Sequence, residues 1–406
     1  MNNWKKDITL FLTGQTISLF GSLLVQYAIM WYVVLQTGSG AMMTVYIIAG
    51  LLPTFFISPF GGVWADRFNR KSLIIIADSG IALATLILAV LFFSGFKEIW
   101  LIFLAAGIRA AGAGIHTPAV GAFIPQIVPS ANLTRINGIY GSMQSAMMLV
   151  SPMASAALLT FTRIELIFLI DVVTAAIAVS ILIFLLRVSP HQKALEKQKT
   201  AYFRDMHDGI IYIKNHNYIK SFFIFFAVMH FLIAPVAFLT PLQVTRSFGK
   251  EFWRLTAIEV LFSLGMTVGG AIIASWGGFK NKVHTMITAM LLIGICTLAF
   301  GVLSDFWIYL FLMLIIGISL PMFTTPSTVL IQQKVEQNFL GRVFGVYGMI
   351  SSFMMPMGML LFGPIADSIK IELMLIITGI LLSAEGFVLF GSKELVKAGE
   401  PAMQDA

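Results

Sequence analysis

Five charged side chains lie inside long stretches of apolar residues, where charge is expensive. They are Asp78, Arg109, Asp171, Glu259 and Glu385. A charged side chain at the centre of a bilayer costs about 2.5–3.5 kcal/mol on insertion scales, so such residues are functional candidates by default. An apolar environment disfavours the charged form of a carboxylate. The four acids therefore offer one kind of chemistry: a carboxyl group that takes up a proton on one side of a membrane and releases it on the other.

The composition places these residues in a membrane protein. Of the 406 residues, 58% are hydrophobic and 11% are charged, whereas soluble domains keep about 25% charged residues. Twelve stretches reach the roughly 20 apolar residues that a transmembrane helix needs. Their centres are near Leu23, Leu52, Ala84, Gly107, Met148, Thr174, Val228, Met266, Ile293, Leu314, Met357 and Ile380. We expect an all-α membrane protein of twelve transmembrane helices, with no room for a soluble catalytic domain.

The basic residues predict the orientation of the chain. With a cytoplasmic N-terminus, 19 of the 26 Lys and Arg residues would lie inside, Arg109 within a span and six outside. The six are Lys97, Arg163, Arg246, Lys250, Arg254 and Lys370. The positive-inside rule then places both termini in the cytoplasm. The first span is too long for the apolar region of a signal peptide, so we expect no cleaved signal. The single cysteine, Cys296, excludes disulfides and thiolate metal sites.

The chain divides into two halves of six spans. A polar and basic segment over 189–220 separates residues 1–188 from residues 221–406. Within it, Phe203, Met206, Ile210 and Ile213 recur at helical spacing, which predicts an amphipathic helix on the inner leaflet. A docking site for a partner protein is the alternative.

An internal repeat supports this division. Thr117-Pro118 recurs as Thr325-Pro326, and the seven residues from Arg135 to Gly141 match those from Arg342 to Gly348. The offsets are 208 and 207 residues, so one residue has been lost between the two matches. Such repeats are typical of secondary transporters.

The loop between the second and third spans carries the first family resemblance. It reads Gly62-Val63-Trp64-Ala65-Asp66-Arg67-Phe68-Asn69-Arg70-Lys71 and resembles the loop signature of the major facilitator superfamily. That resemblance implies two pseudo-symmetric halves around a central cavity. It also implies a gate made by Gly62, Asp66, Arg67, Arg70 and Lys71, which pairs with the opposite half; the alternative is that these cations only set topology. Asn69 stands where the family has Gly, and we expect it to adopt a left-handed backbone.

Further motifs resemble the macrolide-efflux (Mef-like) exporters of the drug:proton antiporter branch. They are Gly14-Gln15, the span containing Gln26, Ala77-Asp78, Arg109-x-x-Gly112, His116-Thr117-Pro118-Ala119, Val150-Ser151-Pro152, Ile170-Asp171-Val172, Glu259 before Ser263-x-Gly265-Met266, and Leu340-Gly341-Arg342-Val343-Phe344. The resemblance implies proton-driven export of amphipathic, drug-like compounds, macrolides among them. It implies alternating access in a bacterial inner membrane, a monomer and no cofactor. The expected partners are a small hydrophobic substrate, protons and the lipid bilayer.

One departure from that branch concerns the fifth span. The family's Gly-Pro-x-x-Gly-Gly pattern is replaced by Ser151-Pro152-Met153-Ala154-Ser155-Ala156. Small residues still permit close packing of helices, and proline can still bend one. We therefore expect Pro152, and Pro356 in the eleventh span, to bend their helices.

The proton-coupling candidates each have a structural alternative. We favour Glu259 over Asp171 as the protonation site, because Arg254 is poorly placed to pair with it; Asp171 could pair with Arg163 near the outer surface. Arg109 resembles the fourth-span Arg implicated in proton transfer. Its alternative is an ion pair with Asp78. Glu385 ranks third, and His230 is expected to be a hydrogen-bonded core residue.

Four residues are candidates for substrate binding: Gln26, Trp31, Tyr32 and Phe226. A buried amide needs partners, and aromatic rings stack on ring systems. The 35 Phe and 22 Met residues suit an adaptable binding surface, although most of them must face lipid or pack between helices.

Several functions are excluded. The sequence has no Gly-x-x-x-x-Gly-Lys-Ser/Thr phosphate loop, no zinc spacing among its histidines and no Ser-His-Asp set in one membrane layer. The cations are arranged for a membrane and not for nucleic acid. A membrane enzyme would need acids or histidines clustered at one depth, and a sensor would need a soluble domain. The remaining alternatives are a dedicated exporter of a metabolite, siderophore or lipid-like compound, and an importer.

Overall fold

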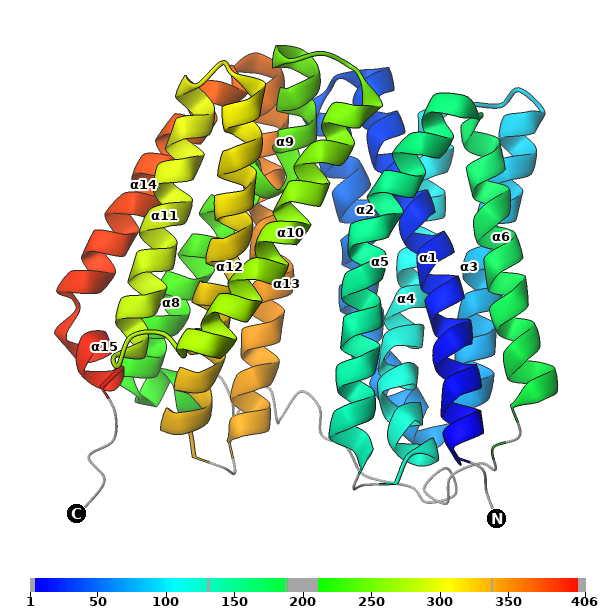
Figure 1. The fold of residues 1–406 in the computed structure, drawn as a ribbon, viewed down its shortest axis with the longest axis horizontal. Helices are drawn as coiled ribbons and strands as arrows, with labels where there is room; N and C mark the ends of the chain where they lie inside the picture. The colour runs from blue at the N-terminus through cyan, green and yellow to red at the C-terminus, as the bar shows by residue number, and fades with distance from the viewer. Residues whose placement is uncertain (1–3, 130–131, 187, 189–210, 337–338, 401–406) are drawn as a thin grey trace. The chain divides into compact units, whose positions relative to one another are not determined.

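A computed structural model describes residues 4–129, 132–186, 188, 211–336 and 339–400, and all regular structure in these ranges is helical (Figure 1). Twelve helical segments are long and apolar enough to cross a membrane, and each predicted span centre falls inside one of them. Helices are the expected solution, because a backbone in lipid must satisfy its hydrogen bonds within the segment. The prediction of twelve transmembrane helices is confirmed.

Two compact units make up the chain. Unit 1 comprises Met1–Thr37 and Val45–Lys199, and unit 2 comprises Gly38–Thr44 and Thr200–Ala406. The short segment that joins the first two spans therefore belongs to unit 2.

The first six spans are formed by α1 (Trp4–Thr37), α2 (Gly40–Arg67), α3 (Arg70–Phe93), α4 (Ile99–Ile127), α5 (Leu133–Phe161) and α6 (Ile164–Ser180), which is extended by a π-helical turn, η2 (Ile181–Leu185). The last six are formed by α8 (Asn217–Leu232) with α9 (Ala234–Ser247), then α10 (Phe252–Trp276), α11 (Lys282–Val302), α12 (Phe306–Lys334), α13 (Leu340–Ser368) and α14 (Ile371–Gly391). A short helix, α15 (Lys393–Ala398), follows.

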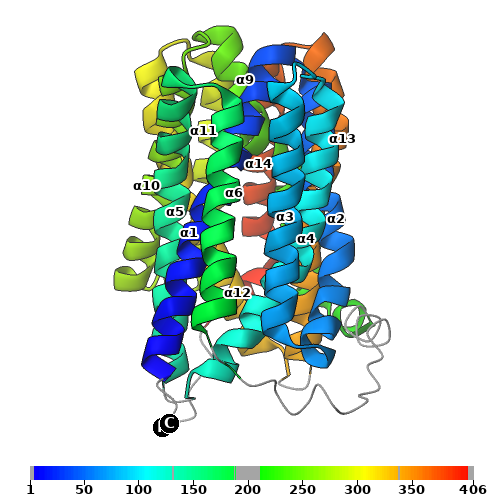
Figure 2. The same cartoon turned by 90° about the vertical axis from the view of Figure 1, so that its right-hand side faces the viewer.

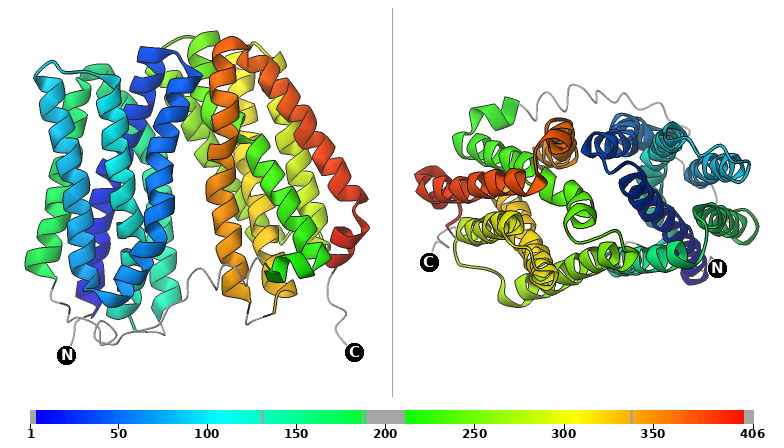
Figure 3. Two further views of the ribbon diagram at one scale, coloured as in Figure 1. Left: turned by 180° about the vertical axis from the view of Figure 1, so that it is seen from behind. Right: turned by 90° about the horizontal axis from the view of Figure 1, so that it is seen from above.

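Helix neighbours repeat from one unit to the other. In unit 1, α3 lies against α4 and α6, while α1 lies against α5 and α6 (Figures 1 and 2). In unit 2, α11 likewise lies against α12 and α14, while α8 and α9 lie against α13 and α14 (Figure 3). The same neighbour relations in both units confirm the predicted pair of six-helix repeats.

Proline has different effects along these helices. The seventh span is interrupted between α8 and α9: Ile233 is the N-cap of α9, and Ala234-Pro235 form its first turn. Proline lacks the N–H that a continuing helix requires but suits a first turn. Pro152 and Pro356, by contrast, lie within helices that continue past them, and their bending of α5 and α13 stays a prediction.

Candidate functional site

Unit 1 holds a buried ion pair between α4 and α6. The Arg109 guanidinium donates through Nη1 to Asp171 Oδ2 and to the Thr85 hydroxyl, and through Nη2 to the backbone oxygen of Ser22 at 3.2 Å. The hydroxyls of Thr85 and Ser22 lie 2.9 and 3.2 Å from the Asp171 carboxylate oxygens. Asp171 has no exposed surface. Residues on α1, α3, α4 and α6 thus contribute hydrogen bonds to this ion pair. A buried ion pair needs such additional hydrogen bonds to offset the cost of removing its charges from water.

This pairing corrects two sequence-based interpretations. Arg109 does not pair with Asp78, because the antiparallel register of α3 and α4 brings Thr85 opposite Arg109. Asp78 lies seven residues earlier, about 10 Å along the helix. Asp171 does not pair with Arg163 either. It lies seven residues into α6, about 10 Å from the helix start.

Asp78 has a different neighbour, which the sequence analysis missed. The Nε2 atom of His116 on α4 lies 3.3 Å from Asp78 Oδ1, within ion-pair distance but outside hydrogen-bond geometry. The other oxygen, Asp78 Oδ2, is buried and has no hydrogen-bond partner. The available signal was a shared spacing: Asp78 and Thr85 are seven residues apart on α3, and so are Arg109 and His116 on α4.

Within the described spans of unit 2, Glu259 and Glu385 have no cation as an ion-pair partner. Glu385 on α14 is 8% exposed, and neither of its carboxylate oxygens has a hydrogen-bond partner. Glu259 on α10 is half-buried. Arg254 pairs with Glu251 at 3.3 Å and so does not neutralise Glu259. His230 is buried, with Nδ1 2.8 Å from the backbone oxygen of Phe226, as expected for a core histidine.

The loop signature forms a turn between α2 and α3. Helix α2 ends at Arg67, and Asn69 caps α3 by accepting a hydrogen bond from the Lys71 N–H at 3.0 Å. The φ and ψ of Asn69 are −62° and 113°. The expected left-handed backbone is therefore wrong: the residue acts as an extended N-cap, a position that Asn favours.

The cations of the signature bind helix ends within unit 1. Arg70 donates to the backbone oxygens of Ala65 at 2.9 Å and Ala122 at 3.0 Å, near the ends of α2 and α4. Lys71 Nζ donates to the oxygen of Leu186 at 2.9 Å, at the end of η2. The backbone oxygens of Ala65 and Leu186 lie at helix ends, where carbonyl groups lack intrahelical hydrogen-bond partners. Arg70 and Lys71 therefore stabilise the ends of these helices.

The other members of the signature are less informative. Gly62 is partly buried, Arg67 is exposed, and the side chain of Asp66 lies outside the described part of the structure.

The expected substrate-binding residues differ in exposure. Gln26 is exposed, and Tyr32 packs against Phe92 with ring centroids 5.9 Å apart. Trp31 is fully buried, and its indole N–H has no hydrogen-bond partner. Gln26, Trp31 and Tyr32 belong to α1 in unit 1, and Phe226 belongs to α8 in unit 2.

Phe226 lies in an aromatic stack inside unit 2. Its ring stacks on Tyr347 with a centroid distance of 4.3 Å and on Phe323 at 6.2 Å. Phe226 is only 1% exposed, whereas Tyr347 is half-buried. Tyr347, noted in the sequence only as part of the repeat, is thus the more accessible ring of the stack.

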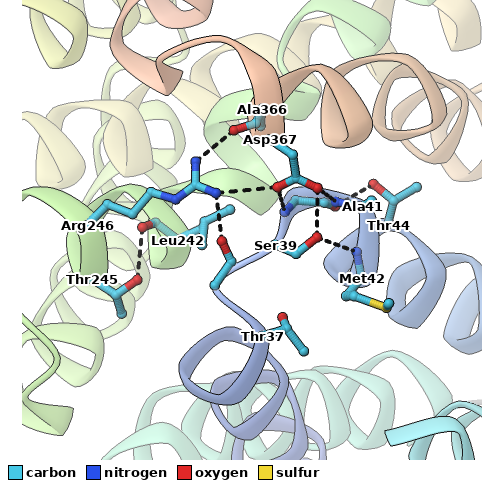
Figure 4. A network of polar contacts seen from close by, with 12 residues as sticks. Thr37, Ser39, Ala41, Met42, Thr44, Leu242, Thr245, Arg246, Ala366 and Asp367 are labelled. Carbon is cyan, nitrogen blue, oxygen red and sulfur yellow. Dashed lines mark hydrogen bonds and ion pairs between the residues drawn. The ribbon is translucent and has the colours of Figure 1, made fainter.

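Besides the Arg109–Asp171 network of unit 1, a polar network in unit 2 surrounds Asp367 at the end of α13 (Figure 4). Its carboxylate accepts hydrogen bonds from the backbone N–H groups of Gly40 at 2.6 Å and Ala41 at 3.0 Å, and from the Ser39 hydroxyl at 2.7 Å. Arg246 Nη2 is 3.3 Å away, and the same guanidinium also donates to two backbone oxygens.

The sequence carries a repeated pattern at this network. Gly363-Pro364-Ile365-Ala366-Asp367 repeats the Gly-x-x-Ala-Asp pattern of residues 62–66. A Cβ atom on Gly40 would lie 2.3 Å from the Gly363 oxygen, so the two backbones meet closely beside the carboxylate.

Twelve spans in two repeated units, with charged pairs held inside the spans, define a multi-pass membrane protein with the architecture of a secondary transporter. The Major Facilitator Superfamily profile matches residues 8–359. The chain belongs to this superfamily of transporters and is not an enzyme, as the sequence predicted.

Curated relatives are similar over most of the chain. Macrolide efflux protein A of Streptococcus pyogenes is 30% identical over 383 residues, which cover 94% of each chain. Macrolide efflux protein A of Enterococcus faecalis is also 30% identical, over 79% of this chain and 99% of that protein. The expected resemblance to macrolide-efflux proteins is confirmed.

Solved transporters share the fold. A bacterial homologue of the human lysosomal transporter Spinster, in an inward-facing and unoccupied conformation, matches with a TM-score of 0.72 at 14% identity. The match covers 99% of this chain and 100% of that one.

Proposed function

We propose that this transporter exports amphipathic, drug-like compounds, macrolides among them, from the bacterial cytoplasm in exchange for protons. The observation that carries the proposal is Glu385, a buried carboxyl whose two oxygens have no hydrogen-bond partner. An unneutralised carboxyl in a membrane span is stable in its protonated form and can exchange that proton when its surroundings change. The similarity to macrolide efflux proteins supports the choice of cargo.

The acids divide into two kinds in this proposal. Glu259 and Glu385 lack cations and serve as proton carriers. Asp171 is held by Arg109, so a proton on Asp171 would compete with the guanidinium. We assign this pair the role of coupling protonation to the packing of α1, α3, α4 and α6, the four helices that contribute to it. Asp78 is the remaining proton-coupling candidate in unit 1.

The substrate and gate assignments also belong to the proposal. Gln26 and Tyr32 are accessible polar groups on α1, whereas Trp31 and Phe226 would contact cargo only in a conformation that uncovers them. Gly62, Asp66 and Arg67, with Arg70 and Lys71, form the gate, and Arg70 and Lys71 additionally hold the helix ends of unit 1. Transport proceeds by alternating access.

We further propose an inner-membrane monomer with both termini in the cytoplasm. The excess of Lys and Arg in the segments assigned to the cytoplasm supports this orientation.

The test is export of a labelled macrolide from intact cells, with and without a proton uncoupler, by the wild type and the variants Glu385→Gln and Glu259→Gln. We expect uncoupler-sensitive export that falls at least about tenfold in one or both variants. Glu251→Gln is the matched control, because Glu251 is an exposed acid next to α10.

Two results would contradict the proposal. Export that ignores the uncoupler removes proton coupling. Absence of macrolide export, with uncoupler-sensitive export of a siderophore, metabolite or lipid-like compound from a wider panel, moves the cargo to the dedicated-exporter alternative.

A further inference from the structure

Two polar pairs link α3 to α4 at different depths. The Thr85–Arg109 contact forms one level, and the Asp78–His116 contact forms the other. The two residues on each helix are seven positions apart, so the levels are separated by two helical turns, about 10 Å. The level with Asp78 and His116 is nearer to the start of α3 at Arg70.

The helices approach closely between these levels. A Cβ atom on Gly112 would lie 2.6 Å from a side-chain carbon of Ile81 and 3.4 Å from the Ala77 oxygen. Gly112 thus allows α4 to pack directly on α3. This close packing brings the side chains of His116 and Asp78 within reach of each other.

The two levels differ in how well their charges are satisfied. Asp171 receives hydrogen bonds from Arg109, Thr85 and Ser22. Asp78 is 4% exposed, its Oδ2 has no partner, and its only ion-pair neighbour among the described residues is His116. A buried carboxylate left in this state is costly. A proton shared with the adjacent imidazole removes that cost.

We propose that Asp78 and His116 form a proton-binding pair of their own, separate from the Arg109–Asp171 pair. The His116 side chain is 20% exposed, whereas that of Asp78 is 5% exposed. His116 is therefore the more accessible member of the pair, although its Nε2 atom is buried beside Asp78. We assign proton uptake to the imidazole and storage of the proton to Asp78. A role for this pair in transport rests on the proposed proton-coupled export. Proton binding by the pair is independent of that proposed function.

The transfer step is balanced within the pair. Once the two side chains turn into hydrogen-bond geometry, the imidazolium of His116 gives its Nε2 proton to Asp78 Oδ1. The N–H bond breaks as the O–H bond forms, and a charged pair becomes a neutral imidazole and a carboxylic acid. Addition of a second proton to Nε2 of the imidazole gives a pair with a net charge of +1. The two protons belong to the pair as a coupled system and not to either residue alone.

Other ionisable groups face this pair from the surrounding helices. Asp171 on α6 and Tyr140 on α5 interact electrostatically with Asp78, and Arg109 lies two turns away on the same face as His116. Of these, Arg109 and Asp171 neutralise each other, which leaves His116 as the group that sets the charge of Asp78.

The experiment is infrared difference spectroscopy of the full-length protein in lipid vesicles, titrated with pH in H2O and in D2O. A protonated carboxyl gives a C=O band that shifts in D2O, and a carboxylate does not. We expect Asp78→Asn to remove one such band from the wild-type spectrum. We expect His116→Gln to move the midpoint of that band by about one pH unit or more, since each group senses the charge of the other. Glu98→Gln, at an exposed acid before α4, is the control and leaves the band in place.

Each outcome decides the proposal. An unchanged carboxyl spectrum in Asp78→Asn overturns it, and so does a wild-type titration that His116→Gln leaves unmoved. If Asp78→Asn does not fold, the comparison of His116→Gln with the wild type still decides. Uncoupler-insensitive export by the wild type would overturn the proposed function and leave the spectroscopic result standing.

Discussion

Arg109 on α4 and Asp171 on α6 neutralise each other in the interior of unit 1. Arg109 does not pair with Asp78, and Asp171 does not pair with Arg163. Removing one partner of a buried pair leaves an uncompensated charge, at a cost of about 3–5 kcal/mol, whereas replacing both partners can be nearly neutral. The pair is therefore a strong determinant of which helices pack together.

Asp171→Asn should destabilise the protein by about 3–5 kcal/mol, because Arg109 then keeps its charge without a counter-ion. The double variant Arg109→Met/Asp171→Leu should recover most of the loss. Unfolding titrations in mixed detergent micelles measure both. Glu98→Gln, at an exposed acid before α4, is the control. A double variant that loses as much stability as Asp171→Asn, or more, would contradict this prediction.

Asp367→Asn should also destabilise unit 2, by about 1–3 kcal/mol, because a neutral amide cannot accept from Gly40, Ala41, Ser39 and Arg246 together. Glu372→Gln is the matched control, since among the described residues Glu372 accepts a side-chain hydrogen bond only from Ser247. The same unfolding titration applies. A loss no larger than that of the control would mean that the Asp367 network contributes little to stability.

The sequence could predict the spans and the candidate acids, because long apolar runs and the charges inside them need no knowledge of packing. It could not predict the partners. Whether Arg109 meets Asp78 or Asp171 depends on the register of three helices, which a one-dimensional pattern does not contain. The equal spacing of Asp78 with Thr85 and of Arg109 with His116 was visible, but it has meaning only once α3 and α4 are known to be antiparallel neighbours.

Local backbone chemistry was predicted only in part. Asn69 was expected to replace a glycine by adopting a left-handed backbone, yet it caps a helix. The repeat supports the second interpretation, because Asn281 caps α11 in unit 2 by accepting from the Val283 N–H at 2.9 Å. The same residue type thus starts corresponding helices in both units.

These two caps give a paired prediction. Asn69→Ala and Asn281→Ala should each cost about 0.5–2 kcal/mol of stability. Asn69→Asp should be tolerated, since a carboxylate also caps a helix and favours its N-terminus. Asn281→Asp should not be, because Asn281 Nδ2 also donates to the Val396 oxygen at 2.7 Å. Thermal unfolding of the four variants measures the difference, and equal tolerance of Asp at both positions would contradict it.

Two glycines set the crossing of α10 and α12. A Cβ atom on Gly265 would lie 2.3 Å from the Leu314 oxygen, and one on Gly317 would lie 2.3 Å from the Phe262 oxygen. Backbone cannot move aside as a flexible side chain can, so the helices must separate to admit a methyl group at either position. Helix packing in membranes depends on such small residues, because lipid supplies no hydrophobic drive for association.

Gly317→Ala should therefore destabilise the protein by about 1–3 kcal/mol, the usual cost of overpacking. Gly270→Ala is the matched control on α10, because a Cβ atom there meets nothing within 4 Å. That variant should be neutral or gain up to about 1 kcal/mol, since alanine is the better helix former. Unfolding titrations of both variants under one condition give the comparison. If Gly317→Ala were as stable as Gly270→Ala, the close crossing of α10 and α12 would not be a requirement of the fold.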